Sequence, residues 1–230
     1  MMIKSILLSI SIMLLLTGCP SMAWKPAPPQ REILEGLANQ NQIKISRNKI
    51  TGASKLKLAI ISSANVQPQI QAYGENVNQY KGLISHYSSD AEKLNADADI
   101  VFSDKLYLQA IISSLKSRFS ETFYANDLAS AFAKGADYAA VLDIRLEMID
   151  LSNKYYPGPM MEDDIANIRT LFISKNLEGG PDVVVNNRIK DVTEGKGPEA
   201  NIRYTLNRMK NVRLKSLKDF EAELSKVVIK

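Results

Sequence analysis

The spacing of apolar residues predicts a central strand followed by a helix in the first half of the chain. In residues 55–62, polar and apolar side chains first alternate and then give way to a continuous apolar run. This pattern is typical of a strand that is covered on both faces. Residues 104–119 place apolar side chains every three or four positions, as a helix with one buried face does. The positions on that face are Leu108, Ile111, Ile112, Leu115 and Phe119. We therefore expect this helix to pack on the sheet.

Shorter elements follow, and then the longest strand. Residues 121–125 predict a short strand, and Asn126 is a good cap for a helix that Gly135 ends in the left-handed conformation. The residues of this helix that we expect inside are Leu128, Ala129 and Phe132. Residues 138–148 alternate again, so we expect a long strand with one core face and one polar face. The polar face would carry Asp143, Arg145 and Glu147, either as a row of surface ion pairs or as a surface that a partner recognises.

The last third of the sequence predicts a hairpin and two terminal helices. Residues 165–176 and 182–191 read as two strands joined at the Gly- and Pro-containing segment 177–181. One helix is expected over 199–209, and a last helix begins at the loose capping box Ser216-Leu217-Lys218-Asp219. The order of elements predicts an α/β (α+β) fold: a mixed sheet with crossover helices, followed by an antiparallel hairpin and terminal helices.

The predicted elements define one globular α/β domain over residues 51–230. Within it, residues 64–98 are rich in Asn, Ser and Gln and have few apolar positions, which indicates an insertion with a weak helix. Residues 155–164 read as a mobile loop, and Tyr155 and Tyr156 in it are candidate stacking surfaces for a glycan.

The first 19 residues have the features of an export signal. Lys4 precedes an apolar run over residues 6–16, which is too short for a permanent membrane span. The segment Leu16-Thr17-Gly18-Cys19 resembles the lipobox of bacterial lipoproteins. The resemblance implies cleavage before Cys19, a diacylglycerol thioether on its sulfur and an acylated amino end, palmitate being a typical chain. An ordinary signal peptide that happens to contain a cysteine and a short buried helix are the alternative interpretations.

If residues 1–18 are removed as a signal peptide, residues 19–50 remain in front of the domain. They would comprise the lipidated Cys19, a proline-rich tether and a weak helix. Cys19 is the only cysteine, so once its sulfur is alkylated the chain has no disulfide, thiolate metal site or cysteine nucleophile. The formal charge of +4 is mild, which argues against a nucleic-acid partner.

The side chains that carry catalysis or bind metals are sparse. His86 is the sole histidine, and its neighbours in sequence predict a loop histidine rather than a catalytic base. The run Glu162-Asp163-Asp164 offers oxygen ligands but matches no calcium-loop spacing, so a solvated acidic patch is the better interpretation. The segment Gly195-Lys196-Gly197 lacks the rest of a phosphate-binding loop. We therefore assign no catalytic residue, no metal site and no cofactor.

The clearest candidate for a binding surface is a basic run near the carboxyl end, with no acidic residue inside it. Its members are Arg203, Arg208, Lys210, Arg213, Lys215 and Lys218. Such a patch suits lipid phosphates, anionic glycans or an acidic protein surface. The alternative is a solvated helix exterior.

The globular part resembles a group of envelope lipoproteins. The resemblance rests on the apolar positions of residues 108–119 and 128–132, on Phe123-Tyr124, and on the run Gly135-Ala136-Asp137-Tyr138 that leads into a long strand. The group includes the curli-secretion pore lipoprotein, the Pel exopolysaccharide-export lipoprotein and the lipoprotein activators of penicillin-binding proteins. The resemblance to this group implies a fold like that of the amino-terminal domain of the Tol system's β-propeller protein.

These observations favour a lipoprotein held by the lipid on Cys19 at the outer membrane, facing the periplasm. The first hypothesis is a non-enzymatic docking or assembly module in envelope biogenesis or export, which binds an envelope protein or a second copy of itself. The alternatives are a lipoprotein that binds peptidoglycan or another glycan, and a glycan hydrolase that uses carboxylates alone.

Overall fold

The structure, a computed structural model, describes residues 48–64, 66, 81–82, 84–86, 88–101, 103–150, 160–193 and 198–230. The predicted signal peptide, the lipobox with Cys19 and most of the tether lie outside these residues, as do Tyr155 and Tyr156. Within the described ranges, no helix is both long and apolar enough to cross a membrane.

A five-stranded mixed sheet forms the framework, in the order β2-β1-β3-β4-β5. Its strands are β1 (Lys57–Ser62), β2 (Glu121–Tyr124), β3 (Tyr138–Asp150), β4 (Met160–Ser174) and β5 (Gly179–Thr193). β1 pairs in parallel with β2 and β3, whereas β3, β4 and β5 pair antiparallel to one another. The predicted α/β class is therefore confirmed, with crossovers first and a hairpin after them.

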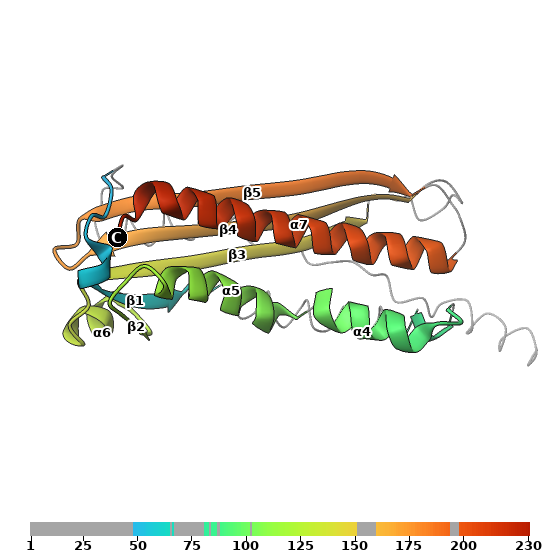
Figure 1. The fold of residues 1–230 in the computed structure, drawn as a ribbon, viewed down its shortest axis with the longest axis horizontal. Helices are drawn as coiled ribbons and strands as arrows, with labels where there is room; N and C mark the ends of the chain where they lie inside the picture. Colours follow the sequence, from blue (N-terminus) through green and yellow to red (C-terminus); the bar gives the residue numbers. More distant parts are fainter. Residues whose placement is uncertain are drawn as a thin grey trace, which may run out of the picture.

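The helices cover the two faces of the sheet unequally. The helices whose bounds the structure describes are the short η1 (Ala53–Lys55), α4 (Ala91–Val101), α5 (Asp104–Lys116), α6 (Leu128–Ala133) and α7 (Pro198–Val227). α7 lies along β4 and β5, and α4 and α5 follow one another beside it (Figure 1). The small α6 packs on the other face against β1 and β3. The molecule is consequently elongated, with α7 along its length.

Each face of the sheet has its own apolar core. On the α7 face, Leu58 and Ile60 of β1 and Phe172 of β4 are buried with Phe220 and other residues of α7. On the α6 face, the buried residues include Ala59, Ile61, Leu128, Ala131, Val141 and Leu171. β1 is thus buried on both sides, which confirms the prediction from its continuous apolar run.

The two predicted terminal helices are one continuous helix. α7 runs through residues 210–215 without a break, because no Gly or Pro interrupts them and apolar residues such as Val212 keep the helical period. Ser216 is fully buried and is not a cap. Its hydroxyl donates to the Arg213 carbonyl at 2.8 Å and bonds the hydroxyl of Tyr107 on α5. The predicted capping box at Ser216 is therefore wrong.

The start of α6 is shifted by one residue from the prediction. Asp127, not Asn126, is the cap, and its carboxylate accepts the Ser130 amide at 2.7 Å. Ala129, which was expected inside, is exposed, whereas Ala131 is buried. Gly135 has a φ of +84°, as expected for a residue that ends a helix in the left-handed region.

The hairpin of β4 and β5 is confirmed, with longer strands and an earlier turn than expected. The turn lies at residues 175–178, and β4 begins at Met160, so the run Glu162-Asp163-Asp164 belongs to a strand and not to a loop. On β3, Asp143 is fully buried and accepts a hydrogen bond from Ser63 at 2.5 Å. The expected exposed ion-pair row is therefore wrong at Asp143, because its side chain points to the α6 face of the sheet, where Val141 and Leu171 are also buried.

Candidate functional site

The six basic residues predicted as one surface all lie on α7, but two of them are buried in the protein. Arg208 and Arg213 are 4% and 6% exposed. The Arg208 Nε donates to Asp164 of β4 at 2.6 Å, and the Arg213 guanidinium lies 5.7 Å from the ring centroid of Tyr107 on α5. These two arginines therefore join α7 to the sheet and to α5.

Two more of the six make ion pairs at the surface. Arg203 binds Glu199 at 2.9 Å and Asp90 at 3.2 Å, which joins the first turns of α7 to the residues before α4. The hydrogen bond from Arg203 holds the pKa of Glu199 below its ordinary value. Lys215 binds Asp219 at 2.7 Å and, as the largest cause, lowers the pKa of that carboxyl. Both charges are thus matched within the domain.

Lys210 and Lys218 are exposed and make no ion pair within the described part of the chain. They share one side of α7 with two exposed apolar side chains, Tyr204 at 39% and Leu214 at 54%. We call these four residues the outer face of α7. It combines positive charge with apolar area, which is a composition suited to contact with another macromolecule.

The other residues singled out in the sequence do not assemble into a reactive site. His86 is exposed, in a helical segment before α4. Gly195-Lys196-Gly197 lies outside the described residues. In the ranges that the structure describes, no group of three or more His, Cys, Asp or Glu side chains gathers as a metal site would require.

Two carboxyl groups that the sequence pattern predicted to be solvated, Asp143 and Asp164, are buried, so that prediction is wrong for both. Asp143 and Asp164 are 0% and 1% exposed. They lie on opposite faces of the sheet, since Asp164 points to α7 and Asp143 to the face that carries α6. The two carboxylates therefore do not face each other across a common site, which is what a pair in a glycan hydrolase would have to do.

A group of lysines gathers at the end of the domain where the described chain begins. β1, β2 and β3 all start at this end, the β4–β5 turn closes there, and Ile50 pairs with Val228 after α7 (Figure 1). We call it the tether end, made of residues 48–57, 121, 134–137, 174–179 and 226–230. Its lysines are Lys49, Lys55, Lys57, Lys134, Lys175, Lys226 and Lys230.

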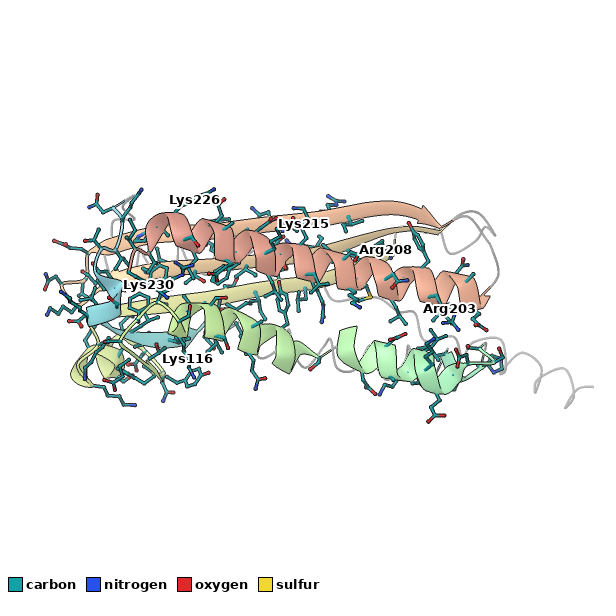
Figure 2. The ribbon with its side chains drawn as sticks, in the orientation of Figure 1. Lys116, Arg203, Arg208, Lys215, Lys226 and Lys230 are labelled. Atoms are coloured by element: carbon teal, nitrogen blue, oxygen red, sulfur yellow. The ribbon has the colours of Figure 1, made fainter. Side chains whose placement is uncertain are left out.

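The lysines of the tether end are far apart in sequence, and only the topology brings them together. Lys57 starts β1 and binds Glu121 at the start of β2 at 2.7 Å. Lys175 lies in the hairpin turn, 3.6 Å from Asp137 before β3. Figure 2 shows Lys226 and Lys230 at this end and Arg203 at the opposite end. No local motif could have indicated such a group.

Comparison with known proteins gives only distant likenesses. No family model matches the chain, and no curated protein matches it. Among solved structures, rare lipoprotein B from Shewanella oneidensis is similar at 12% identity and a TM-score of 0.38, over 74% of this chain and 94% of that one. A minor lipoprotein from Acinetobacter baumannii is similar at 9% identity and a TM-score of 0.33, over 75% and 93%.

A third similar structure is the PelC dodecamer from Paraburkholderia phytofirmans, at 8% identity and a TM-score of 0.32, over 76% of this chain and 93% of that one. TM-scores of this size do not assign the chain to a family.

Proposed function

We propose that this chain is a lipoprotein of the bacterial cell envelope, held at the outer membrane by acyl chains on Cys19 and facing the periplasm. Its α/β domain would act there as a non-enzymatic docking or assembly module in envelope biogenesis or export. The observation that carries the proposal is the sequence Leu16-Thr17-Gly18-Cys19 after a short apolar run, with the sole cysteine at the lipidated position.

The lipid is what would keep the domain at a membrane. Each methylene that an acyl chain buries contributes about 0.8 kcal/mol, and two or more chains give stable attachment where one does not. The proline-rich tether predicted after Cys19 would separate the lipid from the fold. Attachment through the lipid leaves the surface of the domain available to a partner.

The outer face of α7 is the surface that we propose for docking. Its lysines, Lys210 and Lys218, make no ion pair within the described part of the chain, and Leu214 and Tyr204 add apolar area between and beside them. A rigid helix presents these side chains in a fixed geometry, which lowers the entropy cost of binding. An acidic protein of the envelope or a second copy of the chain is the expected partner.

Fractionation of cells tests the anchor. Wild-type protein is expected in the membrane pellet and should dissolve only in detergent, whereas Cys19→Ser should move to the soluble fraction. Ser21→Ala is the matched control, because it changes a neighbouring small polar residue and keeps the lipidated sulfur. Membrane retention of Cys19→Ser, or a soluble wild-type protein, would contradict the proposal.

Photocrosslinking in intact cells tests the docking surface. A crosslinker at position 210 or 218 should give an adduct of defined mass, whereas one at Ala129, which is exposed on α6 at the other face of the sheet, should give none. An adduct of twice the protein's mass would identify a second copy as the partner. Equal adducts at all three positions, or none at 210 and 218, would refute the docking surface.

A further inference from the structure

Positive charge is concentrated at the tether end beyond what its own acidic side chains match. The tether end has seven lysines but three acidic side chains in the described structure, which are Glu121, Asp137 and Glu178. Lys57 binds Glu121, Lys175 lies near Asp137, and Lys226 binds Glu223 of α7 at 2.6 Å. The other four lysines keep their charge at the surface.

Three of these remaining lysines are exposed and make no ion pair in the described ranges: Lys49, Lys55 and Lys134. They come from the segment before η1, from η1 itself and from the residue after α6. Three separate backbone segments thus hold them at one end of a rigid sheet. A long lysine side chain on such a frame can extend its ammonium group to a surface beyond the backbone.

The opposite end of the molecule carries the opposite charge. The start of α7, α4 and the residues before α4 present five acidic side chains and three basic ones in the described ranges. The acidic ones are Asp90, Glu92, Asp97, Asp99 and Glu199, and the basic ones are Lys81, Lys93 and Arg203. The long axis of the domain therefore runs from a positive end to a negative end, and a negative surface attracts one end and repels the other.

The tether alone would not orient the domain. Residues 19–47 could extend to about 100 Å, which exceeds the length of about 45 Å that the 30 residues of α7 span. Either end of the domain could therefore reach the membrane. Electrostatic attraction acts only within about 8 Å at physiological ionic strength, so the end that touches the headgroups is the one whose charge matters.

We propose that the tether end rests on anionic phospholipid headgroups, with Lys49, Lys55 and Lys134 as the contacting residues. This orientation presents α4 and the first turns of α7 to the periplasm. The inference builds on the lipid anchor proposed above, and its partner is the phosphate of an anionic phospholipid in the membrane that holds the anchor.

The test uses the lipidated full-length protein with one added cysteine as the attachment point for a fluorophore. Because the sulfur of Cys19 carries the proposed lipid, an added cysteine is the only thiol that reacts. Ser54→Cys places the probe on η1 at the tether end, and Ala96→Cys places it on α4, both at exposed positions. The protein is reconstituted in vesicles of phosphatidylcholine with about one third phosphatidylglycerol, or of phosphatidylcholine alone, each with a headgroup nitroxide quencher.

We expect the probe at position 54 to be quenched in the anionic vesicles, and the probe at position 96 to be unaffected. Quenching at 54 should fall to the phosphatidylcholine level in roughly 0.5 M salt, which screens the charges. The triple variant Lys49→Gln, Lys55→Gln and Lys134→Gln should lose it as well. Its matched control, Lys81→Gln, Lys93→Gln and Lys215→Gln, removes the same charge at positions outside both proposed contact surfaces and should keep the quenching.

Equal quenching at 54 in neutral vesicles, or quenching that survives the triple variant, would overturn the proposed contact. Stronger quenching at 96 than at 54 would reverse the orientation and overturn it too. Flotation of the protein with vesicles at high salt reports the anchor separately. Loss of flotation contradicts the lipid anchor, whereas flotation without the lysine-dependent quenching contradicts only the contact.

Discussion

At the scale of single residues, the charges on α7 differ in what surrounds them. Arg208 and Asp164 are both buried and form an ion pair between α7 and β4 at 2.6 Å. Removing one member of such a pair leaves an uncompensated charge in the interior, which costs far more than the intact pair contributes. Lys210, two positions away on the same helix, is exposed. Burial, rather than the type of charge, determines how strongly each side chain affects the free energy of unfolding.

We therefore expect Arg208→Met to lower the free energy of unfolding by about 3–5 kcal/mol. The matched control Lys210→Met should change it by less than about 0.5 kcal/mol. Denaturant unfolding measures both, and the double change Asp164→Leu with Arg208→Met should restore much of the loss, because no charge then stays buried. Equal costs for the two single variants would contradict the buried pair.

Tyr107 makes the alkaline stability of the protein depend on one buried hydroxyl. Burial raises the pKa of Tyr107 to about 12, although the hydrogen bond with Ser216 and the nearby Arg213 charge act in the opposite direction. The ordinary value is about 10, so between these two pH values the unfolded chain loses the proton while the folded chain keeps it. The free energy of unfolding must therefore fall as the pH rises through this window.

The variant Tyr107→Phe should show a shallower fall in the free energy of unfolding from about pH 10 to about pH 12. Urea unfolding at several pH values measures the slope. Tyr124→Phe is the control, because the Tyr124 ring is 57% exposed on strand β2. A slope for Tyr107→Phe that equals the wild-type slope would show that Tyr107 is not held neutral by burial.

At the scale of elements, the helix boundaries depend on short-range hydrogen bonds. Asp127 accepts the Ser130 amide, and Ser130 in turn bonds back to the amide of Asp127 at 3.3 Å. These hydrogen bonds lower the pKa of the Asp127 carboxyl, so its contribution to stability is present at neutral pH and is lost as the pH falls through the lowered value. Asn126, one residue earlier, cannot make this arrangement.

The variant Asp127→Ala should lower the melting temperature by roughly 2–4 °C, whereas Asn126→Ala should leave it nearly unchanged. Thermal unfolding followed by circular dichroism measures both. The difference between the two variants should shrink in acid, where the carboxylate is protonated. An equal effect of the two substitutions would contradict the assignment of the cap.

The spacing of apolar residues in the sequence was sufficient to predict most of the helices and strands. The features that this spacing did not predict have physical reasons. The period of β1 predicted a strand buried on both faces, and the alternation in residues 138–148 predicted β3. The continuity of α7 was also readable, since Leu206, Met209 and Val212 keep one helical stripe. Arg208 and Arg213 fall within that stripe, which identifies them as inward-facing residues that a count of charges alone misses.

At the scale of the whole molecule, topology brings together the lysines of the proposed membrane contact. Parallel pairing of β1 with β2 and β3 brings three strand starts to one end, and the hairpin turn and the end of α7 join them. Lys55 and Lys134 thereby lie on the same surface, although 79 positions separate them in the chain. Such a surface becomes visible only when the strand order is known.

We propose that a lipid on Cys19 holds this domain at a membrane. Mass spectrometry of the protein purified from its native membrane detects that lipid. We expect an amino-terminal peptide that begins at Cys19 and carries the mass of a diacylglycerol thioether. A peptide that begins at another residue, or a Cys19 with an unmodified thiol, would contradict it.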